Sequence, residues 1–362
     1  MTSIGLAPTG ERSGVPALGG VGVLQLMCWN LVLIAVALAL DESWPTIVAV
    51  AAAAVAITAL TAVRLRGRWL YEWLVFALRY RMRERGWDLP AAGETGRALL
   101  DRIAPEAVGV TSAGDPAVFM ISRAEGITAV LLPASAAHNL TEAIPAPATL
   151  LPAHDEQAFA FAVQVVHHAG MNRTRPPRIW VAVQALRTAE VYRDADLGQA
   201  LGNTVRRVQR RFRRDGLPAR TLSEHEALGT LAALAHVNGG RSTVREQWRQ
   251  WQSGPVEQAV FRLGGWGELA PAVATHLLGR LLTAAPQAAV TVAVTAHRTP
   301  VGTAPAVTAL VRIAATSTAA LDSAGVELTR LVRERGVDPE RLDGRHAWGV
   351  AATLPLGVVT AR

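Results

Sequence analysis

The sequence predicts an α/β (α+β) protein in which a two-helix transmembrane hairpin precedes a cytoplasmic mixed α+β region. Two observations predict this class: the long apolar runs 21–40 and 46–63, and the strand-like and helix-like segments that alternate from about residue 103 onward. Each apolar run holds about 18–20 residues, which as a helix can cross a hydrocarbon core about 30 Å thick. The five residues between the runs, 41–45, leave room only for a tight helical hairpin.

The segments at the start of the chain support this interpretation. Residues 1–20 are rich in Gly, Pro, Ser and Thr, and we predict a disordered cytoplasmic tail. A cleaved signal peptide is the competing interpretation for the first run, because Ala35-Val36-Ala37 resembles a cleavage site. However, the run is longer than a usual signal core, and a second apolar run follows at once. The transmembrane hairpin, residues 21–63, is therefore the favoured prediction.

The charges beside the hairpin predict its orientation. The turn carries Asp41 and Glu42, whereas Arg64, Arg66 and Arg68 directly follow the second run. Positive residues stay on the cytoplasmic side of a membrane. We therefore predict two spans in the cell inner membrane, with both termini and the soluble region in the cytoplasm.

Two amides interrupt the first apolar run. Gln25 and Asn30 lie among apolar residues, and a polar amide in lipid usually faces another helix. We predict that both make intramembrane helix contacts. The partner helix is either the alanine-rich second run of the same hairpin or a helix of another membrane subunit.

A basic and aromatic juxtamembrane segment, residues 64–102, follows. Trp69, Trp73, Phe76 and Tyr80 lie three or four positions apart, which predicts a helix with one aromatic face. Cations next to a membrane attract anionic headgroups, and interfacial helices bury aromatic side chains at the acyl boundary. The residues predicted to contact lipid headgroups or a partner are Arg64, Arg66, Arg68, Arg79, Arg81, Arg83, Arg85, Trp69 and Trp73. Binding of nucleic acid is the less favoured use of such a segment beside a membrane.

Residues 103–255 are predicted to form the first half of a cytoplasmic α/β domain. Strands are expected at residues 117–123, 127–132, 159–167 and 178–186, with Gly126 in the first hairpin turn. An amphipathic helix is expected over residues 196–214. A second helix is expected over residues 223–236, with a capping box formed by Ser223 and Glu226.

Residues 256–362 are predicted to form a second half with the order βαββαβ. Strands are expected at 258–263, 288–297, 306–315 and 347–354, and helices at 268–284 and 316–335. This is the order of the ferredoxin-like split βαβ fold. The preceding half is expected to follow a looser version of the same plan.

Composition excludes several kinds of chemistry. All 36 basic residues are arginine, the net charge is +7, and without lysine there is neither a P-loop lysine nor a Schiff base. The single cysteine, Cys28, lies within the first apolar run, which excludes intrachain disulfides and a soluble thiol nucleophile. Gly264-Gly265-Trp266-Gly267 lacks the spacing of a dinucleotide-binding loop and is expected to be a strand-to-helix turn.

Three polar groups remain to be interpreted. His167 and His168 are adjacent on a predicted strand, point to opposite faces, and have no further ligand at metal spacing. Asp194-Ala195-Asp196 has the Asp-x-Asp form that holds a divalent ion in nucleotide-sugar transferases, although acidic residues also favour the first turn of a helix. The arginines of residues 206–214 form either a solvated face or a docking face for an acidic partner. We predict no catalytic residue, no cofactor and no metal.

Several of these segments resemble a known family. They are the two apolar runs, Arg68-Trp-Leu-Tyr-Glu-Trp-Leu, the strands that contain Arg178-Ile-Trp-Val-Ala-Val and Gln258-Ala-Val-Phe-Arg-Leu, and residues 341–357. The last of these reads Arg-Leu-Asp-Gly-Arg-His-Ala-Trp-Gly-Val-Ala-Ala-Thr-Leu-Pro-Leu-Gly and is the most specific. From residue 20 onward the chain resembles EccE, a core membrane component of actinobacterial type VII (ESX) secretion systems.

This resemblance implies a structural inner-membrane subunit that assembles with EccB, the EccC ATPase and EccD, and that is not an enzyme. Membrane lipids are its other expected partner, and nucleic acid is not. Because the soluble domain of this family has been likened to glycosyltransferase-type folds, a membrane-anchored glycosyltransferase-like enzyme that uses Asp194-Ala195-Asp196 is the alternative. The resemblance carries over no catalytic residues.

Overall fold

The computed structural model describes residues 23–65, 68–90, 93–111, 118–134, 143–153, 159–172, 174–237, 243–298 and 304–359. The chain forms two compact units, Met1–Glu84 and Arg85–Arg362. The predicted tail, residues 1–20, lies outside the described residues.

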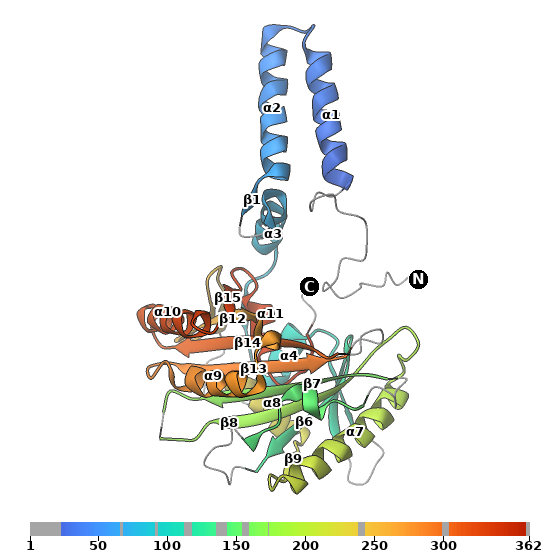
Figure 1. The fold of residues 1–362 in the computed structure, drawn as a ribbon, viewed down its shortest axis with the longest axis vertical. Coiled ribbons are helices and arrows are strands. Elements are labelled where there is room, and N and C mark those ends of the chain that lie inside the picture. The colour runs from blue at the N-terminus through green and yellow to red at the C-terminus, as the bar shows by residue number, and fades with distance from the viewer. Residues whose placement is uncertain are drawn as a thin grey trace. The chain divides into compact units, whose positions relative to one another are not determined.

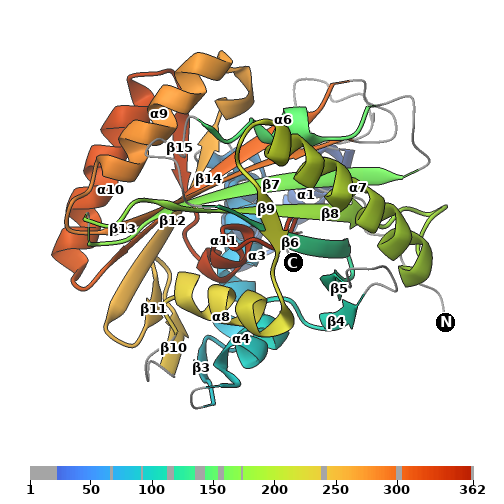
Figure 2. The same ribbon diagram turned by 90° about the horizontal axis from the view of Figure 1, so that it is seen from below.

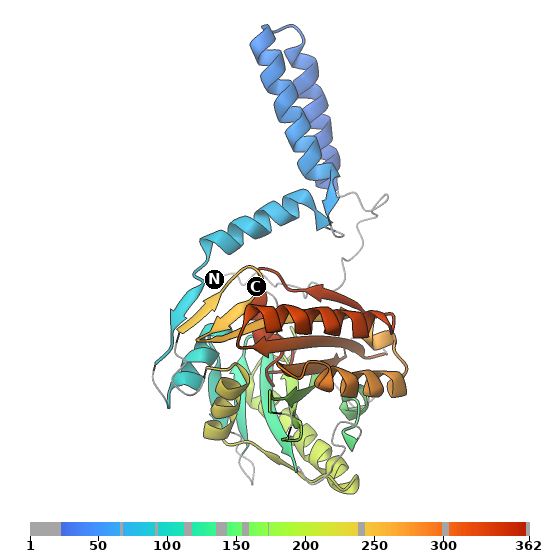
Figure 3. The ribbon, with the colours of Figure 1, turned by 90° about the vertical axis from the view of Figure 1, so that its left-hand side faces the viewer.

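The first unit is helical. Helices α1 (Val23–Ala39) and α2 (Trp44–Ala62) lie side by side as a hairpin (Figure 3). The two-residue strands β1 (Arg64–Leu65) and β2 (Arg68–Trp69) then lead to α3 (Leu70–Met82). Within the described residues, α2 is the one helix that is long and apolar enough to cross a membrane. Helix α1 has 17 residues and a length of about 26 Å. The span predicted for residues 21–40, which contain α1, therefore stays a prediction.

The second unit is built on a mixed α+β arrangement with one large sheet, in agreement with the predicted fold class (Figure 1). Among the described residues the sheet has thirteen strands, and each of their pairings is antiparallel. The strands are β3 (Gly86–Asp88), β4 (Val108–Thr111), β5 (Phe119–Arg123), β6 (Gly126–Pro133), β7 (Ala160–Ala169), β8 (Arg178–Leu186), β9 (Ala219–Thr221), β10 (Thr243–Glu246), β11 (Trp251–Ser253), β12 (Val256–Gly264), β13 (Ala289–His297), β14 (Ala306–Ala315) and β15 (Asp338–Arg341). The helices are α4 (Thr95–Ile103), α6 (Pro147–Leu150), α7 (Asp194–Arg214), α8 (Glu224–Leu234), α9 (Pro271–Thr283), α10 (Thr318–Arg333) and α11 (His346–Ala352).

The sheet contains the same strand order twice. In the first half, residues 126–221, the spatial order is β9-β6-β8-β7; in the second half, residues 256–341, it is β15-β12-β14-β13. Each half therefore places its fourth strand beside its first, then its third, then its second. Strands β7 and β13 join the halves, with Val290 opposite Ala169 and His297 opposite Ala162.

The sheet is covered on both faces. Helices α6 and α7 cover one face of the first half, and α9 and α10 cover the same face of the second half (Figure 2). Helices α4, α8 and α11 cover the opposite face together with the C-terminal residues Leu354 and Leu356. Strands β7 and β13 are buried almost throughout, which explains why both are nearly continuous apolar runs.

The helices follow from local sequence signals. On α7, Leu197, Leu201, Val205, Val208 and Phe212 form one stripe, and each side chain is at most 2% exposed. Helix α8 begins with the predicted capping box, in which the Ser223 side chain and the Glu226 side chain bond reciprocally to backbone N–H groups.

One predicted element is wrong. Residues 347–354 were expected as the last strand, but they lie in helix α11 and the turn that follows it. The fourth strand of the second half is instead β15, which pairs with β12. The error has a physical cause, since a short apolar run that is buried on all sides has the same pattern in a strand and in a helix.

Candidate functional site

The amide of Gln25 joins the two helices of the first unit. Its Nε2 atom donates to the Thr61 carbonyl at 2.9 Å, and Trp29 Nε1 donates to Thr61 Oγ1 at 2.9 Å. Asn30 instead donates to the Leu26 carbonyl in its own helix. The structure thus shows contacts of Gln25 within this chain, and contact of either amide with another subunit stays a prediction.

The arginine-rich segment around α3 combines stacked cations with an exposed apolar stripe. The Arg64 guanidinium lies 3.9 Å from the ring centroid of Trp69, and the Arg83 guanidinium lies 5.3 Å from that of Tyr80. In each pair the guanidinium packs on the face of a buried aromatic ring, which is a favourable cation–π interaction, and the charge stays at the surface. Large apolar side chains of α3 are exposed: Leu74, Val75, Leu78 and Met82. This stripe was missed in the sequence because the aromatic spacing dominates the same helix.

The other residues of the predicted lipid or partner contact are distributed between the two units. Arg79 and Arg81 are exposed on α3, and Trp73 is half-buried beside Phe76. The Arg85 carbonyl accepts a hydrogen bond from the Glu246 backbone N–H and belongs to the second unit. Arg66 lies outside the described residues, and Arg68 is described through its backbone alone.

The Asp-x-Asp pair at the start of α7 is split between two environments. Arg187 Nη2 donates to Asp194 Oδ1 at 2.5 Å, and Ser122 Oγ donates to Asp194 Oδ2 at 2.9 Å. Burial acts to raise the pKa of Asp194, but the hydrogen bonds from Arg187 and Ser122 outweigh it, and the pKa lies below its ordinary value. Asp196 is exposed as Asp194 is, but it projects about 160° away from Asp194 around the helix axis.

Metal chemistry finds no support in this arrangement. Among the residues that the structure describes, no group of three or more His, Cys, Asp or Glu side chains is placed to hold a metal ion. The Asp194 carboxylate is bound to Arg187, so it stabilises the junction of β5, β8 and α7. Nothing in the structure supports the glycosyltransferase alternative.

The adjacent histidines of β7 point to opposite faces of the sheet, as expected. His167 is 4% exposed on the apolar face, and burial lowers its pKa to about 3. His168 Nδ1 lies 2.9 Å from Thr291 Oγ1 on the other face, and its ring centroid is 6.2 Å from that of His236. The pair therefore contributes to two different layers of the core.

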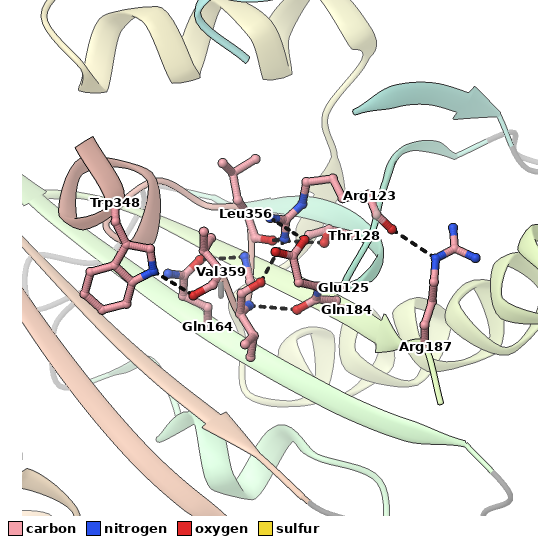
Figure 4. A network of polar contacts seen from close by, with 11 residues as sticks. Arg123, Glu125, Thr128, Gln164, Gln184, Arg187, Trp348, Leu356 and Val359 are labelled. Carbon is pink, nitrogen blue, oxygen red and sulfur yellow. Dashed lines mark hydrogen bonds and ion pairs between the residues drawn. The ribbon is translucent and has the colours of Figure 1, made fainter. Parts of the chain in front are cut away.

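Helix α11 leads into a segment that we name the C-terminal strap, Thr353–Val359. The strap crosses the strands of the first half, where it accepts bonds from Thr128 and Arg123 at the Leu356 carbonyl (Figure 4). Gln164 forms two hydrogen bonds with this segment. Its side chain donates to the carbonyl of Ala352, just before the strap, at 2.8 Å and accepts from the N–H of Gly357, within the strap, at 2.9 Å. Backbone N–H and C=O groups of the strap, which lie outside any helix or strand, thus find hydrogen-bond partners within the core.

Two further contacts complete the attachment of the strap. Gln184 Oε1 accepts from the Val358 N–H at 2.7 Å, and Trp348 Nε1 donates to the Val359 carbonyl at 2.9 Å (Figure 4). Gly357 has φ +78°, and a Cβ atom there would lie 2.4 Å from Gln184 Oε1. The glycine that ends Leu-Pro-Leu-Gly is therefore required by a left-handed backbone and by close packing.

Helix α7 presents the strongest charged surface of the second unit. Arg206, Arg210, Arg211, Arg213 and Arg214 are exposed, and Arg207 is half-buried. The Arg211 Nε atom pairs with Asp215 at 3.5 Å, within the same helix turn. A groove of about 640 Å³ lies along the helix and has Phe159, Phe161, Asp196, Arg207 and Arg210 in its lining. The periodicity revealed the arginines but not the groove, which depends on a distant strand.

The fold and these surfaces first define a class. One apolar helix of membrane-spanning length, followed by a helix that exposes both apolar and arginine side chains, indicates a membrane-associated protein.

The comparison with protein families gives the second step. Residues 173–263 match the family described as "Putative type VII ESX secretion system translocon, EccE". The resemblance to EccE is thus confirmed, and it indicates a type VII secretion translocon component. The match begins just before β8 and ends near the end of β12, so it contains α7 and α8. A search of curated proteins finds no match.

Proposed function

We propose that this chain is a non-enzymatic core membrane subunit of a type VII protein secretion complex in the inner membrane of an actinobacterium. It gives structural and docking support to the export channel and assembles with EccB, EccC and EccD. The observation that carries the proposal is the match of residues 173–263 to the EccE family. The energy for export then comes from a partner, since a chain without lysine has no P-loop lysine.

The proposed topology has two spans. Helices α1 and α2 cross the membrane, α3 lies at the cytoplasmic interface, and residues 85–362 are cytoplasmic. The exposed Leu74, Leu78 and Met82 insert at the acyl boundary, while Arg79, Arg81 and Arg83 contact anionic headgroups or a partner. Gln25 and Asn30 then lie within the membrane, where polar contacts between helices favour a fixed packing.

The proposed fold of the cytoplasmic region is a pair of ferredoxin-like units. Each half places its strands in the spatial order fourth, first, third, second, with antiparallel neighbours. This order and the sequence βαββαβ support a ferredoxin-like assignment for residues 256–341 and, with a shorter first helix, for residues 126–221.

The assembly test is gentle extraction of the affinity-tagged full chain from its native membrane, followed by native electrophoresis and mass spectrometry. We expect EccB, EccC and EccD in one large assembly with the chain. A chain that is extracted alone, under conditions that preserve other large membrane complexes, contradicts the proposal.

The topology test uses single cysteines in a Cys28→Ser background and a membrane-impermeant maleimide. We expect Ser43→Cys to react in intact cells, and Ser13→Cys and Ser323→Cys to react only after permeabilisation. Reaction of Ser13→Cys in intact cells would show that α2 alone spans the membrane. Ser323→Cys is the control, because it tests the side of the soluble region independently of α1.

A further inference from the structure

The second amide of the first unit, Asn30, lies on the side of α1 that faces away from α2. Gln25 and Trp29 bond to Thr61 of α2, which marks the side of α1 that packs on its neighbour. At 100° per residue, Asn30 lies about 140° around the helix axis from Gln25, and its side chain is exposed. The packing of the hairpin therefore leaves Asn30 outside the contact between its two helices.

The hydrogen bonds of the Asn30 side chain are incomplete. Its Nδ2 atom donates to the Leu26 carbonyl at 2.9 Å, within the same helix. In the described part of the chain, its Oδ1 atom accepts no hydrogen bond. Since an amide side chain can donate two hydrogen bonds and accept two, the acceptor atom and one donor of Asn30 remain available to a neighbouring helix.

Asn30 also lies near the middle of its apolar run. In the topology proposed above, residues 21–40 cross the membrane, and Asn30 is about 14 Å along the helix axis from either end of this run. The hydrocarbon core holds no water that could bind the amide. Because the short side chain does not reach the headgroups from this depth, its hydrogen bonds are completed by a polar group of another helix at the same depth.

The amide belongs to an exposed stripe of α1 that we name the Asn30 stripe. Its members are Met27, Asn30, Ile34 and Ala37, and all four side chains are exposed. They follow one another at intervals of three, four and three residues and lie on the side of the helix opposite Gln25. This is the spacing of the seam between two coiled helices, in which a single asparagine among apolar residues fixes the register and the number of helices.

A second copy of this chain provides a matching stripe. The same flanking charges orient every copy, so the Asn30 side chains of two neighbouring α1 helices lie at the same depth. Each amide can then donate to the other and accept from it, and a two-fold axis makes the two contacts equivalent. A helix of a different protein would bind Asn30 only if its own sequence placed a polar group at this depth.

We propose that α1 pairs in parallel with α1 of a second copy of this chain, through the Asn30 stripe and a hydrogen bond between the two Asn30 side chains. The inference rests on the two-span topology proposed above, and it specifies the helix face and the partner of Asn30. The proposed secretion complex then contains this chain in pairs.

The test is disulfide crosslinking of the full chain in its native membrane. Two copies with different affinity tags are expressed together, each with Cys28→Ser and Ala37→Cys, and the membranes are oxidised with copper phenanthroline. We expect a disulfide-linked product that carries both tags. Ala35→Cys is the matched control, because Ala35 is also exposed but lies about 160° around the axis from Ala37. We expect at least about fivefold less product from it.

The contribution of the amide is tested in the Ala37→Cys background. Asn30→Leu is expected to reduce the product by about fivefold or more, because leucine fits an apolar seam but forms no hydrogen bond. Asn30→Gln keeps a donor and an acceptor, and we expect it to retain the product within about twofold. Equal product from Ala35→Cys and Ala37→Cys, a disulfide to a different protein in place of the second copy, or equal product in the Asn30→Leu and Asn30→Gln variants would each overturn the inference.

The result is separable from the assembly and topology tests. A product with both tags from Ala37→Cys, in membranes where EccB, EccC and EccD do not co-purify with the chain, would keep the pairing and reject the proposed complex. Co-purification of all three, with Ser13→Cys protected in intact cells and no product from Ala37→Cys, would reject the pairing alone.

Discussion

Residues 126–221 and residues 256–341 share one strand order. In each half, however, buried polar side chains form hydrogen bonds with the segment that follows the other half in the sequence. In the first half, the side chains of Thr128, Gln164 and Gln184 form hydrogen bonds with backbone groups of residues 352–358. These residues belong to the C-terminal strap or directly precede it, and the strap follows the second half. In the second half, Gln258 donates to the Ala235 carbonyl at the end of α8, which follows the first half.

These reciprocal hydrogen bonds indicate that the two halves are not independent domains. The strap and α8 each leave the half that precedes them and cover the sheet of the other half on the same face. Removal of either segment leaves buried amides without partners in the opposite half, which is costly. We therefore expect the whole region 85–362 to unfold as one cooperative unit.

The largest predicted effect is at Gly357. A valine there would be forced into φ +78° and against Gln184, so we expect Gly357→Val to lower the free energy of unfolding by about 4 kcal/mol or more. The measurement is urea unfolding of the full chain in detergent, followed by tryptophan fluorescence. Gly216→Val is the matched control, because Gly216 has φ +74° with nothing within 4 Å of an added Cβ. Equal losses in the two variants would show that the strap is not tightly seated.

The next effect tests these reciprocal hydrogen bonds directly at Gln164. Gln164→Leu leaves the Ala352 carbonyl and the Gly357 N–H without their partner in the core, and we expect a loss of about 3 kcal/mol. Gln258→Leu, which removes the bond to Ala235 in the other half, is expected to lose a similar amount.

Both glutamine variants should unfold in a single transition by fluorescence and by circular dichroism. Separate transitions for the two halves would break the comparison, because each half would then be stable without the other.

Periodicity predicted much of this fold. The buried stripe of α7 and the capping box of α8 are local signals, and the structure confirms both helices to within about two residues at most ends. The short strands β3, β10 and β11 were missed, since three or four residues carry too little pattern to be recognised without their neighbours in the sheet. The helix at residues 346–352 was mistaken for a strand because a short apolar run that is buried on all sides has the same pattern in either element.

The polar contacts could not be predicted, because they join residues far apart in the chain. Gln164 meets the strap 193 residues away and Arg123 meets it 233 residues away. The sequence singled out Leu-Pro-Leu-Gly as specific but gave no role for it, whereas the structure shows why glycine ends it. The groove beside α7 is lined in part by Phe159 and Phe161 at the start of β7, and the periodicity of the helix gives no sign of that neighbour.

A smaller effect concerns pH and is confined to the first half. His167 on β7 is buried opposite Val292 of β13, and burial lowers its pKa from 6.5 to about 3. Between these values the unfolded chain binds a proton that the folded chain does not, so stability falls as the pH falls from about 6.5 toward 3. The slope is about 1.4 kcal/mol per pH unit, or about 2 kcal/mol by pH 5.

The measurement is urea unfolding of the full chain at pH 7, 6 and 5. His167→Val is expected to remove this part of the pH dependence while fitting the apolar environment. An unchanged slope in the variant would assign the acid sensitivity to other groups.

The smallest effect compares the two buried arginines. Arg123 bonds to the strap and lies 3.4 Å from Glu125, whereas Arg312 donates to Gln258 at 3.1 Å and its Nε and Nη2 atoms have no partner among the described residues. Burial lowers the pKa of Arg312 to about 9, so the group stays charged at neutral pH and burial opposes the charge. Arg312→Met is therefore expected to raise the free energy of unfolding by about 1 kcal/mol at pH 7, with no change between pH 5 and 8. Arg123→Met is expected to lower it, because Glu125 and two strap carbonyls lose their cation. Destabilisation by both substitutions would show that Arg312 stabilises the second half as Arg123 does the first.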